Sequence, residues 1–427
     1  MLTDRTLADW LAWMDSLHPR DIELRLDRMQ PVAARLDLEF GLARAPFPIV
    51  TVGGTNGKGS TAAYLEHMLH AAGYRVGAYT SPHLIRYNER VRLATRDLSD
   101  AELIASFEAV ESARETVPLT YFEFGTLAAM RHFHLSHVDI AVLEVGLGGR
   151  LDAVNLWDAD VAIVTSIGMD HMDWLGDTRE RIGFEKAGIF RAGRAAIIGD
   201  PDPPDTLTAH AHDIGARCLA VGRDFHADDH GTQWTFRGPL GQRAALPIPA
   251  MRGTAQLRNA ACALMALDVL RERFPVTQAN VRAGLLEAVL PGRFQTLPGR
   301  PVRVLDVAHN AEAATVLAAN LRAQPLSGRT LAVCGMLSDK PVEDVARALA
   351  AAIHAWHVAP LDGARGLDAA SLAARLRAGG VSAPIVEHAT VVEAWRAALS
   401  SASADDRVLG FGSFHSVGAI LAALDDT

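Results

Sequence analysis

Residues 48–60 read PIVTVGGTNGKGS and are followed by a helix-forming stretch that ends at Gly73. The first five residues are short and β-branched, so the glycine-rich part is predicted to connect a strand to a helix. At such a turn, the first N–H groups of the helix point outward and collect anions. Lys58 adds a positive charge and Ser60 a hydroxyl able to reach a magnesium ion. Together these features indicate a phosphate-binding loop.

The loop differs from the standard P-loop, which reads Gly, four residues, then Gly-Lys-Ser/Thr. Here Val52 stands at the first glycine position, and Gly59 separates Lys58 from Ser60. A glycine-rich turn with a surface lysine is the alternative interpretation. The strand–turn–helix context favours phosphate binding, in a loop unlike that of ordinary GTPases and kinases.

Composition and length predict a soluble protein with two domains. The 427 residues exceed what one hydrophobic core usually serves, and 49% hydrophobic with 21% charged residues is typical of globular proteins. A net charge of −9 without a broad basic stripe argues against nucleic-acid binding. Cys218, Cys262 and Cys334 lie far apart in apolar neighbourhoods and indicate neither a disulfide framework nor a zinc site.

No targeting or membrane segment is expected. The N-terminus, MLTDRTLADW, has early acidic residues and lacks the apolar core of a secretory signal. No apolar run reaches 18 residues, the length that indicates a membrane span. We therefore expect a cytoplasmic protein with no membrane partner.

Apolar strands alternate with helical segments through most of the chain, which predicts an α/β fold. Because these strands are continuously apolar, they are predicted to form a mainly parallel sheet covered on both faces. Ser99-Asp-Ala-Glu102 and Thr120-Tyr-Phe-Glu123 have the spacing of capping boxes and mark two helix starts. The predicted strands of this part are 48–53, 75–80, 139–145, 160–167 and 195–199, and the predicted helices are 59–72, 99–115, 121–136 and 178–187.

Residues 215–248 interrupt this alternation with short pieces among glycines and prolines, and they predict a small antiparallel region. Helices are predicted at 254–272 and 277–290, before strand–helix alternation restarts. The expected domains are a P-loop-type domain over residues 1–298 and a smaller, Rossmann-like α/β domain over residues 299–427. The predicted strands of the second domain are 302–307, 330–335, 354–358 and 407–411.

Three polar residues follow or end predicted strands. In an open α/β sheet, ligands bind beyond the carboxyl ends of the strands, so Ser81, Glu144 and His171 are expected on the same rim as the loop. Their oxygen and imidazole groups suit magnesium or manganese beside a nucleotide. Each has a structural alternative: an ordinary turn residue for Ser81, a solvated acid for Glu144 and a cap of the next turn for His171.

Further candidates lie beyond these strands. Lys186 falls in the last turn of a predicted helix, where a cation offsets the helix dipole, so the residues alone favour a structural role. The strand 302–307 contains Asp306 and is followed by His309. Arg293 lies in the turn-rich stretch before the second domain, where it either clamps a phosphate or makes an interdomain pair.

Eight separated motifs occur in one order over about residues 18–420: GTNGKGS, TSPHL, LTYFEFGTLAA, EVGLGGRLDAVN, GMDH, LGDT…EKAGIF, PGRFQ and LDVAHN. In this order they resemble the Mur ligase superfamily and, within it, the folylpolyglutamate synthase/dihydrofolate synthase family. The resemblance implies an ATP-dependent ligase of folate biosynthesis and one-carbon metabolism. Two positions depart from the family pattern: Val307 stands where glycine is common, and Gly183 where alanine is frequent.

The resemblance also implies roles for matching residues. Lys58, His171 and Lys186 would be catalytic, with Lys186 carbamylated beside the second of two magnesium sites, where manganese is an alternative ion. This reverses the structural interpretation of Lys186. The implied ATP contacts are Thr55, Asn56, Gly57, Lys58, Gly59, Ser60, Asn259, Arg293, Asp306 and His309; the implied metal ligands are Ser81, Glu144 and His171; the implied pterin contacts are Thr120, Tyr121, Phe122, Glu123, Leu151, Asp152 and Ala153.

The implied reaction joins L-glutamate to dihydropteroate, giving dihydrofolate, and to the γ-carboxylate of reduced folates. It proceeds through an acyl phosphate made from ATP, in an enzyme expected to be a monomer. The TYFEFGT and GGRLDA stretches favour the bifunctional type, and a ligase with only one of the two activities is the close alternative. A P-loop NTPase switch and a non-catalytic nucleotide-binding regulator are alternatives of other classes.

Overall fold

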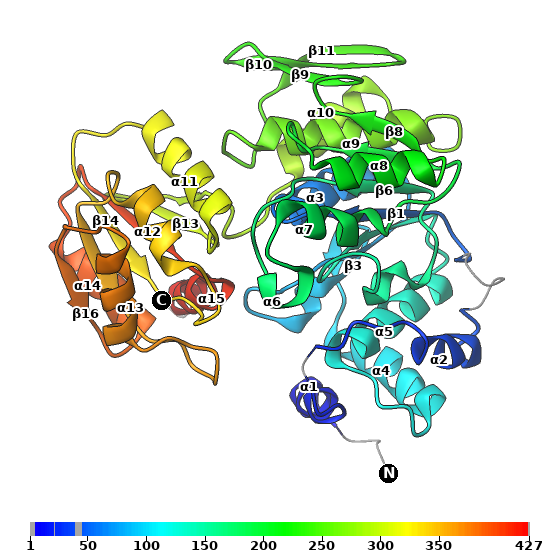
Figure 1. The fold of residues 1–427 in the computed structure, drawn as a ribbon, viewed down its shortest axis with the longest axis horizontal. Helices are drawn as coiled ribbons and strands as arrows, with labels where there is room; N and C mark the ends of the chain where they lie inside the picture. Colours follow the sequence, from blue (N-terminus) through cyan, green and yellow to red (C-terminus); the bar gives the residue numbers. More distant parts are fainter. Residues whose placement is uncertain (1–4, 21, 39–44, 426–427) are drawn as a thin grey trace. The chain divides into compact units, whose positions relative to one another are not determined.

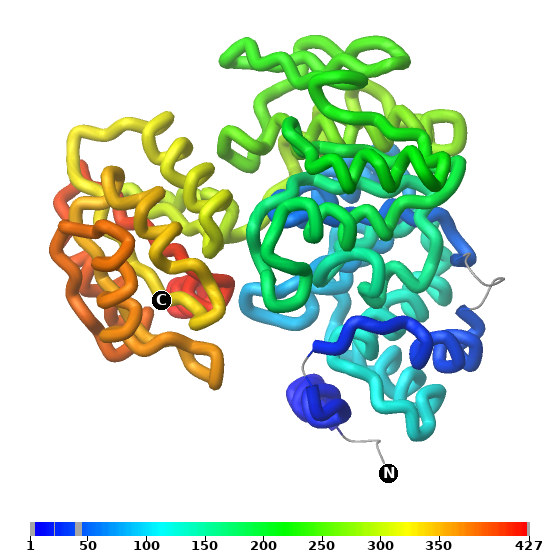
Figure 2. The backbone as a smooth tube through the Cα atoms, viewed as in Figure 1, coloured from blue at the N-terminus to red at the C-terminus, as the bar shows by residue number. Residues whose placement is uncertain are grey.

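The computed structural model describes residues 5–20, 22–38 and 45–425. It divides into two compact units. The first contains the described residues through Ile167, Asp173–Ala250 and Leu257–Ala288, and the second contains Gly168–Met172, Met251–Gln256 and the described residues from Val289 onward. The chain runs mostly from blue to green through the first unit, and from yellow to red through the second (Figure 2). A domain boundary after Pro298 remains a prediction, since compactness divides the chain in more than one place.

An eight-stranded sheet forms the centre of the first unit (Figure 1). Six neighbouring strands run parallel, in the sheet order β2, β5, β1, β6, β7 and β8. Strands β3 and β4 extend the β2 edge and are antiparallel. Strands β1 and β5 are buried at every residue, as predicted for parallel strands covered on both faces. In sheet order the strands are β4 (Arg96–Asp97), β3 (Val91–Leu93), β2 (Val76–Tyr79), β5 (Ile140–Glu144), β1 (Ile49–Gly53), β6 (Val161–Val164), β7 (Ala195–Ile198) and β8 (Arg217–Ala220).

Local capping explains where several helices of this unit begin. Both predicted capping boxes are confirmed: Ser99 and Glu102 exchange side-chain and backbone hydrogen bonds, as do Thr120 and Glu123. Helix α7 is capped by Thr178. The helices are α1 (Leu7–Ser16), α2 (Met29–Arg35), α3 (Lys58–Ala71), α4 (Asp100–Arg114), α5 (Tyr121–Leu135), α6 (Met172–Leu175), α7 (Arg179–Ala187), α8 (Asp205–Asp213), α9 (Gln256–Leu270) and α10 (Gln278–Glu287), with 3-10 turns η1 (Tyr87–Arg90) and η2 (Ala153–Leu156).

The predicted antiparallel region is confirmed in part. Strands β9 (His226–Asp229), β10 (Gln233–Gly238) and β11 (Gly241–Pro247) form a three-stranded antiparallel sheet. The prediction was wrong for β8, which pairs in parallel with β7 in the large sheet. The reason is helix α8, which connects β7 to β8 as the crossover that two parallel strands require.

The second unit contains its own six-stranded sheet, which is parallel except for the edge strand β12. Its core includes Trp356 and Phe411, with ring centroids 5.8 Å apart. The predicted α/β class of this part is therefore confirmed. In sheet order the strands are β12 (Gln295–Leu297), β13 (Val302–Asp306), β17 (Arg407–Phe411), β14 (Thr330–Cys334), β15 (Ala355–Val358) and β16 (Ile385–Glu387); the helices are α11 (Ala311–Ala323), α12 (Val342–Leu349), α13 (Ala369–Ala378), α14 (Val391–Ser401) and α15 (Phe414–Asp425).

No helix in the described part of the chain is both long and apolar enough to cross a membrane.

Candidate active site

The glycine-rich loop connects β1 to α3, as predicted, and requires glycine at two places. Gly54 and Gly57 have φ angles of 137° and 88°, a region that favours glycine. A methyl group on Gly54 would lie 2.0 Å from Oγ1 of Thr165, and one on Gly57 would lie 2.6 Å from Oδ1 of Asn259. The side chains of Thr165 and Asn259 therefore pack closely against the loop. Asn259, which is predicted to contact the nucleotide, lies against the turn at Gly57.

The end of β6 holds the loop in place. Oγ1 of Thr165 donates to the carbonyl oxygen of Asn56 at 2.7 Å, and the Thr55 N–H donates to the carbonyl oxygen of Ser166 at 2.8 Å. The Asn56 N–H donates to Oγ of Ser166 at 3.1 Å. Thr165 and Ser166 were not predicted as site residues, because they are ordinary strand-end residues without a motif. Their contacts fix the backbone of the predicted phosphate-binding residues Thr55 and Asn56.

Two lysines meet at one backbone oxygen of this loop. Nζ of Lys58 lies 3.2 Å from the carbonyl oxygen of Gly54, and Nζ of Lys186 lies 3.0 Å from the same oxygen. Lys58 also donates to the carbonyl oxygen of Thr55 at 3.1 Å. Lys186 is in the last turn of α7, as predicted, but its side chain is 4% exposed and contacts the loop. The Lys58 ammonium beside the N-terminus of a helix makes a positive position suited to an anion.

Two of the three predicted metal ligands contact each other in the first unit. The Ser81 N–H donates to Oε2 of Glu144 at 3.2 Å, and Glu144 is buried at the end of β5. His171 belongs to the segment 168–172 that packs with the second unit, where its Nε2 lies 3.9 Å from Oδ1 of Asp170. Hydroxyl and carboxylate oxygens are the donors that magnesium prefers, so Ser81 and Glu144 fit a hard cation. Among the described residues, no group of three or more His, Cys, Asp or Glu side chains is arranged to hold a metal ion.

The two predicted pterin stretches also meet. Helix α5, which Thr120 caps, contacts η2, which Asp152 caps. The ring of Phe122 packs against Gly146, where a methyl group would lie 2.7 Å from its Cζ atom. Tyr121, Leu151 and the buried Ala153 flank these contacts in sequence. Residues 120–123 and 151–153 therefore lie close together, as a shared substrate site requires.

Two carboxylates in these stretches have different environments. Both oxygens of Glu123 accept from Nε of Arg28, at 3.0 and 2.9 Å, and one also accepts the Thr120 N–H, so its carboxylate has a structural role. Asp152 accepts the N–H groups of Leu147 at 2.8 Å and Val154 at 3.1 Å. Burial raises the pKa of Asp152 to about 6 against these hydrogen bonds, so its charge responds to pH near neutrality.

In the second unit, two of the predicted residues contact the ring of Phe414. The guanidinium carbon of Arg293 lies 5.1 Å from the Phe414 ring centroid, and the His309 ring lies 6.3 Å from the same ring. Asp306 accepts the N–H groups of Phe294 and Ala308, both at 2.8 Å, and burial raises its pKa. Binding of a nucleotide by Arg293, Asp306 and His309 remains a prediction.

The comparisons with known proteins agree with this geometry. A Mur ligase middle domain matches residues 52–267, and a Mur ligase glutamate ligase domain matches residues 292–414. The chain is 45% identical to dihydrofolate synthase/folylpolyglutamate synthase of Escherichia coli over 98% of this chain and 96% of the relative. It is 40% identical to the Haemophilus influenzae protein of the same name, over 98% of each. The chain belongs to the dihydrofolate synthase/folylpolyglutamate synthase family.

Solved members of this family have the same fold. Escherichia coli FolC in complex with DHPP and ADP is 44% identical and superposes with a TM-score of 0.93, over 100% of this chain and 99% of that chain. A bifunctional folylpolyglutamate synthase/dihydrofolate synthase with Mn, AMPPNP and L-glutamate bound is 45% identical, with a TM-score of 0.90 and the same coverage.

The two departures from the family pattern have different structural consequences. Val307 is buried, and its N–H donates to the carbonyl oxygen of Gly292 at 2.9 Å, so this position forms an ordinary backbone contact. Gly183 lies where α7 approaches the start of α8. A methyl group there would lie 2.7 Å from Cγ of Pro204. Glycine therefore permits the close packing of these two helices.

One charged cluster of the second unit was missed by the sequence analysis. Asp170 accepts from Nζ of Lys340 at 2.8 Å and from Nδ2 of Asn310 at 3.1 Å, and Nε2 of His309 lies 3.4 Å from it. Burial opposes the charge of Asp170, but the His309 hydrogen bond and the Lys340 ammonium hold its pKa well below the ordinary value. Asp170 precedes the predicted ligand His171, so this cluster fixes the backbone beside that residue.

Lysine is rare in this chain, and its positions are informative. Of the 41 lysines and arginines, 3 are lysines: Lys58, Lys186 and Lys340. Two meet at the Gly54 carbonyl, and the third forms the buried pair with Asp170. Every lysine of this protein therefore lies in one of the two clusters described above.

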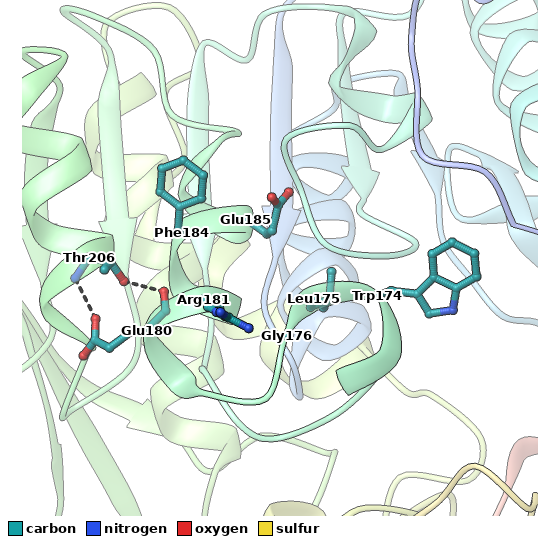
Figure 3. Close-up of a pocket in the computed structure, with 8 residues that line it drawn as sticks. All are labelled: Trp174, Leu175, Gly176, Glu180, Arg181, Phe184, Glu185 and Thr206. Atoms are coloured by element: carbon teal, nitrogen blue, oxygen red, sulfur yellow. Dashed lines mark hydrogen bonds between the residues drawn. The ribbon is translucent and has the colours of Figure 1, made fainter.

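A shallow pocket of about 380 Å³ lies beside α7 (Figure 3). Thr206 donates its N–H to Glu180 at 3.0 Å and its hydroxyl to the Glu180 carbonyl oxygen at 2.6 Å. Glu185 pairs with Arg150 at 2.9 Å and thereby joins α7 to the loop that follows β5. None of its lining residues was predicted as a site residue; they are Trp174, Leu175, Gly176, Glu180, Arg181, Phe184, Glu185 and Thr206.

Proposed function

We propose that the chain is an ATP-dependent ligase that joins L-glutamate to dihydropteroate, giving dihydrofolate, and to the γ-carboxylate of reduced folates. The observation that carries the proposal is the meeting of Lys58 and Lys186 at the Gly54 carbonyl, beside the N-terminus of α3. A triphosphate bound there would meet the Lys58 ammonium and the first N–H groups of a helix. Relatives named for both activities, at 45% and 40% identity over nearly the whole chain, support the substrates.

The proposed reaction begins with a carboxylate of the substrate. Its oxygen attacks the γ-phosphorus of ATP, the bond from that phosphorus to the β,γ-bridging oxygen breaks, and ADP leaves. The glutamate amine then attacks the acyl phosphate, loses a proton, and inorganic phosphate departs. Residues 55–60, which include Lys58, would hold the phosphates of ATP. Residues 120–123 and 151–153 would hold the pterin. Ser81, Glu144 and His171 would hold magnesium or manganese, which would neutralise charge developing on the transferred phosphate.

We further propose that Lys186 is carbamylated. Its ammonium group would first lose a proton, and the neutral nitrogen would then add to carbon dioxide and lose a second proton, which turns a cationic side chain into an anion. Lys186 is buried, and its Nζ shares the Gly54 carbonyl with Nζ of Lys58, so conversion of Lys186 to an anion would relieve the close approach of two like charges. A carbamate at Lys186 would supply a further oxygen ligand beside Glu144 and Ser81.

The scarcity of lysine makes the carbamate directly testable. Protein equilibrated with ¹³C-bicarbonate is expected to show one protected carbamate signal by NMR, absent in Lys186→Arg and retained in Lys340→Arg. A signal that persists in Lys186→Arg, or no signal in the wild type, would exclude carbamylation of this residue.

The function is tested by ATP-dependent release of ADP with L-glutamate and magnesium. The assay is run with dihydropteroate, with tetrahydrofolate, and with neither. Stimulation by both substrates is the expected result. Stimulation by one alone would identify a single activity, as in the Lacticaseibacillus casei relative named folylpolyglutamate synthase, which is 33% identical. Release that needs neither substrate would instead favour the NTPase switch.

A further inference from the structure

A buried ion pair lies between α3 and β3, outside the predicted site residues. Nε of Arg92 lies 3.2 and 3.0 Å from the two carboxylate oxygens of Glu66, and Nη2 donates to Oε2 at 2.8 Å. The Glu66 side chain is 1% exposed and that of Arg92 is 13% exposed. Removing two charges from water is costly, and such a pair adds little net stability by itself. A further contact of the pair is therefore of interest.

The third nitrogen of the guanidinium makes this further contact. Nη1 of Arg92 donates to Oγ1 of Thr80 at 3.0 Å and to the carbonyl oxygen of Glu89 at 2.8 Å. The Thr80 N–H donates to the carbonyl oxygen of Arg90 at 2.9 Å, so Thr80 is held through both its side chain and its backbone. Thr80 immediately precedes Ser81, whose N–H donates to Glu144.

These contacts form a continuous path inside the first unit. It runs from Glu66 on α3 through Arg92 and Thr80 to Ser81, and ends at Glu144. Helix α3 begins at Lys58, so Arg92 connects the helix of the phosphate loop to the two oxygen ligands expected to bind the metal. The Arg92–Glu66 pair is neutral overall and adds no net positive charge that would repel a cation.

We propose that Arg92 is a positioning residue for the divalent metal ion of the metal–nucleotide complex. It acts through Thr80, which fixes the position of Ser81 relative to Glu144 and α3. The positioning role rests on the proposed function, which supplies the metal–nucleotide complex. The role needs arginine, because a planar fork can bind a carboxylate through two nitrogens while a third contacts Thr80. A lysine ammonium cannot span Glu66 and Thr80 with the same geometry.

The test separates positioning from stability. Thr80→Val keeps the shape but removes the acceptor for Arg92, and Thr80→Ser keeps the hydroxyl. Binding of Mn²⁺ is measured by electron paramagnetic resonance with the non-hydrolysable nucleotide AMPPNP, together with the melting temperature of the metal-free protein. We expect Thr80→Val to weaken Mn²⁺ binding at least about tenfold, as losses of partners behind metal ligands usually do. Thr80→Ser is expected to bind like the wild type.

A second pair of variants guards against misfolding of Thr80→Val. Arg92→Lys keeps the charge opposite Glu66 and is expected to weaken Mn²⁺ binding by a similar factor. Arg96→Lys changes an exposed ion pair with Glu102, 2.7 Å long, near the same sheet edge. This variant is expected to bind Mn²⁺ with the affinity of the wild type. Wild-type affinity in folded Thr80→Val or in folded Arg92→Lys would overturn the positioning role. A wild type that neither binds Mn²⁺–AMPPNP nor ligates glutamate would refute the proposed function itself.

Discussion

Replacing Asp152 with asparagine should make the stability of the protein less sensitive to pH between about 4 and 7. The Asp152 carboxyl caps η2 and is 2% exposed. Burial raises its pKa from 3.8 to about 6, while the N–H groups of Leu147 and Val154 act in the opposite direction, as does Lys186 in its cationic, uncarbamylated form. The folded state therefore holds a proton that the unfolded chain has already lost over this range.

The direction and the size of the pH effect on the free energy of unfolding follow from this difference in pKa. Below pH 4 the carboxyl is protonated in both states, and the contribution to folding is fully present. As the pH rises through 6, the folded state must accept a buried charge and the contribution is lost. A difference of about two pKa units corresponds to about 3 kcal/mol. The wild type should lose up to this free energy of unfolding between pH 4 and 7, relative to Asp152→Asn.

The assay is urea unfolding of both proteins at a series of pH values from 4 to 8. An amide at residue 152 leaves one backbone N–H without its partner, but that penalty does not depend on pH and cancels from the slope. Equal pH dependence of the two proteins would refute the reasoning. If Asp152 also binds the pterin as an anion, affinity for dihydropteroate should rise through about pH 6, which equilibrium fluorescence titration would measure.

Three other substitutions test single contacts. Lys58→Ala should lower turnover at least about 100-fold, since a fixed charge at the phosphates is lost. Circular dichroism checks that the variant is folded, and Arg217→Ala, at an exposed residue, is the control substitution. Near-normal turnover of Lys58→Ala would remove the loop from the mechanism. His171→Ala should raise the magnesium concentration for half-maximal activity at least about tenfold, and an unchanged value would reject it as a ligand. Gly183→Ala should lower the free energy of unfolding by about 1–3 kcal/mol through overpacking against Pro204, and a change under about 0.5 kcal/mol in urea unfolding would contradict this.

The parts of the fold that sequence predicts well are those with a local cause. The strand before the loop, the glycines at 54 and 57, and the two capping boxes each depend on residues within a few positions of one another. The parallel sheet follows from continuously apolar strands. The error at β8 has the opposite origin: a short strand after a proline-rich segment looks like the hairpins that follow it, and only its pairing with β7 assigns it to the large sheet.

Contacts between distant residues leave no such local signature. Lys186 has the position of a dipole-stabilising lysine, and only the approach of α7 to the loop places its Nζ at the Gly54 carbonyl, 132 residues away in sequence. Asp170 and Lys340 are 170 positions apart, and each looks unremarkable by itself. Motif resemblance predicts a role at the site for Lys186 where local physics does not, because a motif reflects a tertiary arrangement that local propensity does not encode; the contact with the loop is present, and the catalytic role stays a prediction.

The near absence of lysine adds a chemical argument to these assignments. Arginine serves almost every cationic position of this chain, including the surface ion pairs, so lysine is not used here as a general surface charge. A guanidinium does not lose its proton in proteins and forms a broad fork, whereas an ammonium is a compact charge whose amine can become neutral and nucleophilic. Lys186 is the residue at which we propose carbamylation, and Lys58 is a compact charge that donates to two neighbouring backbone oxygens. The selective use of lysine at these two residues is what amine chemistry and phosphate binding would require.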